Sequence, residues 1–104
     1  MIRILSIGPD PDILAARSRI LAQSGYDVCS AASRADALAA AKLRRFDAVL
    51  LCSEFPFGYA RQLANELRPL IQRAPLIALS GQNPISVAEI EETIRDNEMG
   101  ARAA

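Results

Sequence analysis

The side chains that could do chemistry in this chain stand where short apolar runs end. Cys52 stands at the end of one apolar run and is followed by Glu54, and Ser80 stands at the end of another. Asp10 comes shortly after the first apolar run of the chain. Short apolar runs bounded by turn residues are typical of buried parallel strands, and open α/β sheets bind ligands at the ends of such strands. This set allows a nucleophilic or redox thiol, or a weak cation site made by Asp10, Glu54 and Ser80.

Each of these residues also has a structural interpretation, which the sequence favours. A free cysteine such as Cys52 packs as a small hydrophobic residue, and no neighbouring cation in the sequence would favour its thiolate. Asp10 precedes a proline in the pattern of a helix cap, and Glu54 fits a solvated loop. The chain has no histidine, so it lacks an imidazole base, and its one lysine, Lys42, falls within a predicted helix.

Composition narrows the class of protein. A chain of 104 residues allows one small domain, and 51% apolar with 23% charged residues is ordinary for a globular protein. Twelve basic and twelve acidic residues give no net field for nucleic acid, and no apolar stretch reaches the roughly 20 residues of a membrane span. Cys29 and Cys52 are expected to lie two strands apart, at about 9–10 Å, which is too far for a disulfide bond. Two free cysteines suit a reducing cytoplasm.

Strand and helix patterns alternate along the chain, as in a right-handed parallel α/β sheet. The predicted strands are 2–7, 26–29, 48–51 and 75–79, and the predicted helices are 11–24, 33–44, 59–68 and 86–98. The expected strand order is 2-1-3-4, with the first helix on one face of the sheet and the second and third on the other. The domain spans 1–100, and 101–104 is a frayed tail. The ends of three strands then form a crevice that holds Gly8, Pro9, Asp10, Cys52 and Ser80.

Apolar spacing predicts which side chains enter the core. The first helix is expected to bury Ile13, Ala16, Ile20 and Leu21, and Pro69 to end or kink the third helix. The last helix carries a narrow apolar stripe. The predicted core consists of Ile4, Leu5, Ile20, Leu21, Val49, Leu50, Ile77 and Leu79.

Four segments in register resemble the receiver domain of response regulators. They read Arg-Ile-Leu at 3–5, Asp-Pro-Asp-Ile-Leu at 10–14, Gly-Tyr-Asp-Val at 25–28 and Asp-Ala-Val-Leu-Leu at 47–51. The resemblance covers about residues 2–81. It implies a flavodoxin-like open parallel sheet and a role in two-component signal transduction.

The chain departs from the receiver pattern at each position that carries the family's chemistry. Receivers hold Mg²⁺ with an acidic pair after the first strand, and Gly8 and Pro9 take those places here. Cys52 takes the place of the aspartate that accepts the phosphoryl group, and Asn83 that of the lysine that neutralises it. Only the hydroxyl position, Ser80, is retained. The resemblance therefore implies a degenerate receiver, or pseudo-receiver, with no metal, no cofactor and no enzymatic activity.

The end of the chain leaves two interpretations open. After Ser80 only 24 residues remain, fewer than a receiver's fourth helix, fifth strand and fifth helix require. The segment 83–94 resembles the entry into the family's last helix, which predicts that the fourth helix and fifth strand are missing. The alternative is an ordinary fourth helix in a truncated chain.

The favoured function is a non-phosphorylatable signalling module that acts through protein–protein interaction in the cytoplasm, with no nucleic-acid or membrane partner. A second copy of the chain is one candidate partner, because the fourth strand becomes a sheet edge. The candidate interface residues are Leu76, Val87, Ile90 and Ile94. The alternatives are a redox or catalytic role at Cys52, which rapid alkylation would indicate, and an N-terminal fragment of a larger regulator.

Overall fold

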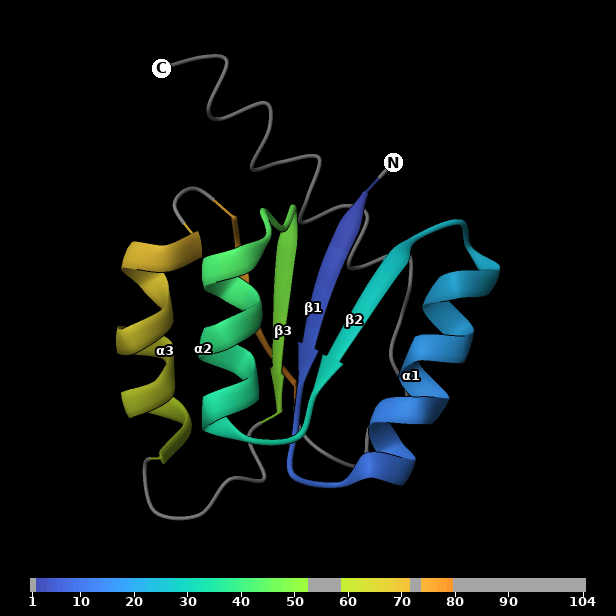
Figure 1. Ribbon diagram of the computed structural model, residues 1–104. Helices are drawn as coiled ribbons and strands as arrows, with labels where there is room; N and C mark the ends of the chain where they lie inside the picture. The colour runs from blue at the N-terminus through green and yellow to red at the C-terminus, as the bar shows by residue number, and fades with distance from the viewer. Residues whose placement is uncertain (1, 53–58, 72–73, 80–104) are drawn as a thin grey trace.

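One parallel sheet organises the protein. The computed structural model describes residues 2–52, 59–71 and 74–79. Within them the chain runs β1 (Arg3–Ile7), α1 (Pro11–Gln23), β2 (Asp27–Ala31), α2 (Arg34–Leu43), β3 (Ala48–Cys52), α3 (Tyr59–Ile71) and β4 (Leu76–Leu79). The strands are all parallel and lie in the order β2-β1-β3-β4 (Figure 1), which confirms the predicted fold class and strand order.

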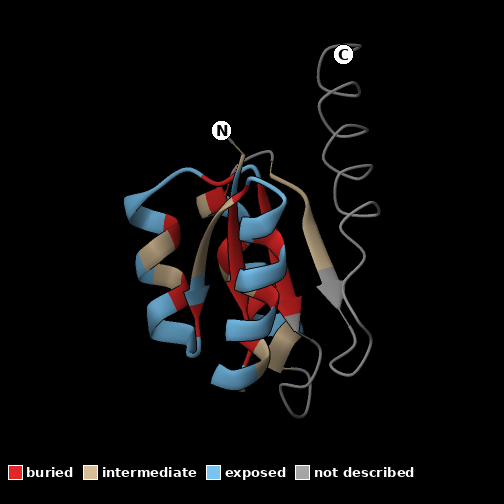
Figure 2. Ribbon diagram, turned by 90° about the vertical axis from the view of Figure 1, so that its right-hand side faces the viewer, coloured by how far each residue is buried: buried red, intermediate tan, exposed pale blue. Residues whose placement is uncertain are grey.

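The helices cover the two faces of the sheet as predicted. α1 lies on one face, and α2 and α3 lie together on the other (Figure 1). Because side chains alternate along a strand, β1 serves both faces: Ile4 packs with Leu21 of α1, and Leu5 packs in the cluster of α2 and α3. The buried residues gather on the central strands, and the outer sides of the helices are exposed (Figure 2).

Local capping fixes both ends of α1. The Asp10 carboxylate accepts a hydrogen bond from the Asp12 N–H at 2.9 Å, and a proline opens the first turn. At the other end the Gly25 N–H donates to the Ala22 carbonyl, and the Tyr26 N–H donates to the Leu21 carbonyl. These two bonds form a Schellman motif, which needs a left-handed residue, and Gly25 has φ +91°.

Replacing Gly25 with alanine is expected to lower the free energy of unfolding by about 1–2 kcal/mol, because an L residue is strained in the left-handed conformation. A Cβ at this position would meet no atom within 4 Å, so the loss would report backbone strain alone. Chemical denaturation measures the effect, with Ser24→Ala as the neighbouring control. A Gly25→Ala protein as stable as wild type would contradict the Schellman geometry.

The predicted inward face of α1 was wrong except at Leu21. Leu14, Arg17 and Leu21 are the buried residues of this helix. Ile20 is 41% exposed, Ala16 is exposed, and Ile13 is only half-buried. The observed stripe places the charged Arg17 at its centre. The sequence pattern therefore pointed to the neighbouring stripe, which is uniformly apolar.

Several element boundaries also differ from prediction. α3 continues through Pro69 to Ile71, because the buried stripe of Leu63, Leu67 and Ile71 keeps one more turn packed on the sheet. That packing outweighs the backbone hydrogen bond that a proline cannot donate. β2 is Asp27–Ala31, one residue later at its start and two at its end than predicted. No helix in the described ranges is long and apolar enough to cross a bilayer.

Candidate functional site

The sequence predicts a crevice at the carboxyl edge of the sheet, the edge where β1, β3 and β4 end. In the strand register Ile7 is opposite Leu51, and Cys52 is opposite Leu79. Gly8 therefore follows β1 at the level where β3 reaches Cys52, and adjacent strands are about 4.8 Å apart. The topology thus brings the backbones of Gly8 and Cys52 to one place, as the sequence predicted.

The turn after β1 offers little to a metal ion. Gly8 is buried, and its N–H donates to the carbonyl of Ala31 at 3.1 Å, which ties the end of β1 to the end of β2. Pro9 is exposed. Neither residue has a side chain with an oxygen, nitrogen or sulfur atom that could bind a cation.

Asp10 is the carboxylate nearest to the end of β1 along the chain, and it acts as the N-cap of α1. Its Oδ1 accepts from the Asp12 N–H, and its extended backbone, with φ −104° and ψ 111°, is that of a cap residue. The structural interpretation of Asp10 is therefore the one that its hydrogen bond supports. In the described part of the chain, no three Asp, Glu, Cys or His residues are grouped so that they could hold a metal ion.

Most of the other predicted site residues lie outside the described residues. These are Glu54, Ser80, Asn83, Val87, Ile90 and Ile94. Leu76, a predicted interface residue, is half-buried on β4 and packs at the margin of the cluster under α2 and α3. The roles assigned to all these residues remain predictions.

Sequence reasoning missed an ion pair between α2 and α3. Arg34 Nε donates to Glu66 Oε2 at 2.7 Å, and the hydrogen bond and charge of Glu66 raise the pKa of Arg34. The two residues are 32 positions apart, so no local spacing signals the contact. The Arg34 side chain is 48% exposed and that of Glu66 28%, and ion pairs in contact with solvent contribute little to stability. It positions α2 against α3 rather than forming a catalytic group.

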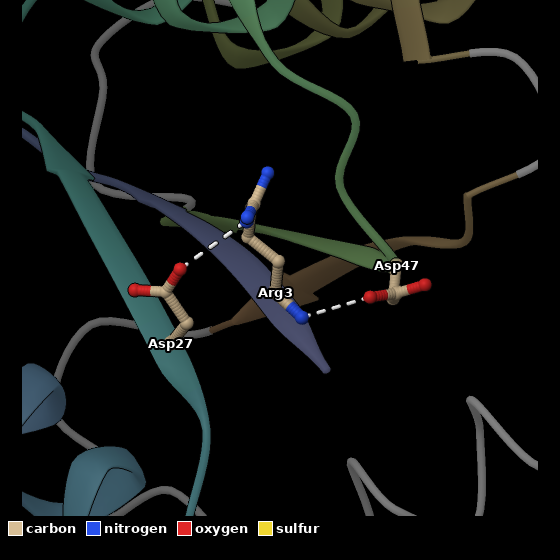
Figure 3. Close-up of polar contacts among 3 residues, drawn as sticks. All are labelled: Arg3, Asp27 and Asp47. Carbon is tan, nitrogen blue, oxygen red and sulfur yellow. Dashed lines mark hydrogen bonds and ion pairs between the residues drawn. The ribbon is translucent and has the colours of Figure 1, made fainter. Parts of the chain in front are cut away.

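A second polar cluster joins the starts of three strands, at the edge opposite the crevice (Figure 3). Arg3 Nε donates to Asp27 Oδ2 at 3.2 Å, and the Arg3 backbone N–H donates to Asp47 Oδ2 at 2.8 Å. Arg3 and Asp27 also face each other in the β1–β2 register. Three of the four receiver-like segments supply these residues. The contacts give these segments a structural role in joining the strands.

Comparisons with known proteins agree with this architecture. No family model matches the sequence. The transcriptional regulatory protein PrrA of Mycobacterium tuberculosis, and likewise that of Mycobacterium bovis, is 31% identical over 83 residues, which is 80% of this chain. The chain spans about a third of the length of these curated relatives (36%).

Solved receiver structures share the fold. The receiver domain of the sensor histidine kinase PA1611 from Pseudomonas aeruginosa, solved with a magnesium ion in its active-site cleft, has a TM-score of 0.73 at 23% identity, covering 91% of this chain and 95% of its own. The response regulator TrrA from Thermotoga maritima has a TM-score of 0.71 at 19% identity, covering 93% and 99%. The chain therefore has the CheY-like receiver fold.

Proposed function

We propose that this protein is a degenerate receiver, a signalling module that accepts no phosphoryl group and acts by binding other proteins. The observation that carries the proposal is the set of residues at the carboxyl edge. Gly8 and Pro9 follow β1, and Cys52 ends β3, at the positions where the receiver pattern has an acidic pair and the acceptor aspartate.

The chemistry of these residues does not suit Mg²⁺. Magnesium requires hard oxygen ligands in near-octahedral geometry, and a thiolate is a soft ligand. Asp10 offers a carboxylate, but it already accepts the first N–H of α1 that needs a cap. Without the metal and the acceptor carboxylate, phosphoryl transfer lacks both its nucleophile and the charge that would stabilise its transition state. Asn83 in the lysine position would not supply that charge either.

The consequence is directly measurable. Acetyl phosphate with Mg²⁺ should leave the mass of the folded protein unchanged.

A signalling output that does not depend on phosphorylation must come from binding. We propose that this binding takes place in the cytoplasm, with proteins rather than nucleic acid or lipid as partners. The response regulator TrrA has been crystallised in complex with the histidine kinase ThkA, which gives a receiver-fold example of such a partner.

A second copy of the chain is the partner that we propose for β4. In the described residues β4 pairs only with β3, so its outer edge presents backbone groups that another strand could pair with. Leu76 and Ile77 on this strand are only half-buried. A two-fold dimer through β4 would pair both edges at once.

Sedimentation equilibrium at tens of micromolar, about the range in which modest interfaces fill, should detect this dimer. Leu76→Lys is expected to shift the protein to monomer, because a lysine on an edge strand opposes pairing. Leu43→Lys is the control, since Leu43 at the end of α2 is 82% exposed. A wild-type protein that is monomeric throughout this range would contradict self-association through β4.

A further inference from the structure

Two polar side chains are buried between α1 and the sheet. Arg17 is only 5% exposed, and Ser6 is fully buried. In the part of the chain that the structure describes, neither Arg17 Nη1 nor Ser6 Oγ has a hydrogen-bond partner. A guanidinium stays protonated at physiological pH and carries five donors. Because a buried charge without a counter-charge is strongly unfavourable, Arg17 requires an anion.

Arg17 and Ser6 lie at the same level of the same face. Ile4 of β1 packs with Leu21 of α1, so by strand alternation Ser6 also lies on the α1 face. The helix runs antiparallel to β1 (Figure 1). Arg17 precedes Leu21 by four residues, about 6 Å along a helix, and Ser6 follows Ile4 by two residues, about 6.6 Å along a strand. Arg17 is therefore placed over Ser6.

Two further hydroxyls flank this position. Ser18, next to Arg17 on α1, has its Oγ 2.7 Å from Ser30 Oγ, and Ser30 is opposite Ser6 in the β1–β2 register. Either hydroxyl can be the donor of this bond, so the other keeps its hydrogen for a second acceptor. Ser30 is exposed, so this side of the position borders solvent. Donors from the helix and from the sheet thus gather at one place.

The described side chains on this face do not supply the anion. Strand alternation from Ile4 gives the sheet residues that face α1, all of them apolar or hydroxyl-bearing: Val28 and Ser30 of β2, Ile4 and Ser6 of β1, Ala48 and Leu50 of β3, and Ile77 of β4. The one acidic residue within α1, Asp12, is exposed in its first turn. It precedes Arg17 by five residues, outside the spacing of three or four at which helix side chains meet.

We propose that Arg17 and Ser6 bind one small tetrahedral oxyanion, of the phosphate or sulfate class, between α1 and the sheet. The planar guanidinium binds two oxygens of such an ion side by side, and the Ser6 hydroxyl donates to a third. Because these donors come from the helix on one side and the sheet on the other, they suit a tetrahedral ion better than a planar carboxylate. The binding is noncovalent and uses no residue of the carboxyl edge, so it is independent of the proposed loss of phosphoryl transfer.

The melting temperature in different salts tests this site. Relative to sodium chloride at equal ionic strength, about 10 mM inorganic phosphate should raise the melting temperature of the wild type by about 5 °C or more, as a ligand of the folded state does. Sodium acetate should raise it less. Arg17→Met should lose the response to phosphate. Arg19→Met is the matched control and should keep it, because Arg19 is exposed on the same helix.

Two further measurements distinguish a bound ion from a partner within the protein. In sodium chloride alone, Arg17→Met should melt no lower than the wild type, because methionine removes a buried charge and keeps an apolar side chain of similar length. Ser6→Ala keeps the charge and removes one donor, so it should raise the Kd for phosphate about tenfold, the loss of one hydrogen bond to a charged group. Isothermal titration calorimetry gives this Kd and should show one phosphate per wild-type chain.

Three results would overturn the proposal. Equal phosphate responses in the wild type and Arg17→Met would show a general salt effect, which acts on both proteins. A wild-type protein that responds to acetate as much as to phosphate, or to neither, would exclude a site for a tetrahedral oxyanion. An Arg17→Met protein that fails to fold in sodium chloride, or melts about 5 °C or more below the wild type there, would assign Arg17 an anion within the protein.

Discussion

Replacing Leu50 with alanine is expected to lower the free energy of unfolding by about 2–5 kcal/mol, the range for large-to-small changes in a core. Leu50 is fully buried at the middle of β3, one of the two central strands. It faces Ser6 on one neighbouring strand and Ile77 on the other, and it packs in the cluster that includes Leu21 of α1. Removing three carbons there leaves a cavity that a β-strand held on both sides cannot close.

Ile20→Ala is the matched control for this measurement. Ile20 has the same number of carbons as Leu50 and was assigned to the same core from the sequence, yet it is 41% exposed on α1. Its loss should be about 1 kcal/mol or less, as at other half-exposed sites. Urea denaturation monitored by circular dichroism gives both values. Equal losses for the two variants would contradict the packing of α1 described above.

The alternation of strands and helices was predictable because each strand is a short apolar run bounded by turn residues. The order β2-β1-β3-β4 followed from the alternation together with the rules for parallel crossovers. The cap of α1 was predictable too, since Asp10 accepts an N–H of the helix it opens. All these signals depend on residues close together in the sequence, so they can be recognised without knowing the tertiary contacts.

The face of α1 could not be predicted for a physical reason. Two neighbouring stripes share Leu21. One is fully apolar, and the other, the one that is buried, contains Arg17. Hydrophobic periodicity selects the first stripe, because a charged residue is expected in a core only where it has a partner, and the sequence does not show the partner. The same limit applies to Arg34 with Glu66 and to Arg3 with Asp27, whose contacts join residues far apart in the chain.

The candidate site was predictable in its backbone and not in its contacts. Topology alone placed Gly8 and Cys52 at one edge of the sheet, and the strand register agrees. The capping of α1 by the Asp10 carboxylate was predicted, whereas the hydrogen bond from the Gly8 N–H to the Ala31 carbonyl was not, because it joins residues far apart in the chain. Both contacts support a site in which backbone and capping roles replace metal binding.

The absence of phosphoryl transfer is the second large expected effect. A receiver that takes a phosphoryl group needs an acceptor carboxylate and a metal ion held beside it, and this chain has Cys52, Gly8 and Pro9 in those three positions. No single substitution would supply what is missing. We therefore expect no phosphorylation at all, rather than slower phosphorylation.

Intact mass spectrometry after incubation with acetyl phosphate and Mg²⁺ tests this claim most directly. The wild-type protein should show no gain of about 80 Da, the mass of one phosphoryl group. Cys52→Ser is the matched control, because an adduct on the thiol would be lost in that variant. An unmodified mass in both proteins is the predicted result. A stoichiometric gain of about 80 Da in the wild type would show that the protein accepts a phosphoryl group, and it would contradict the assignment as a degenerate receiver.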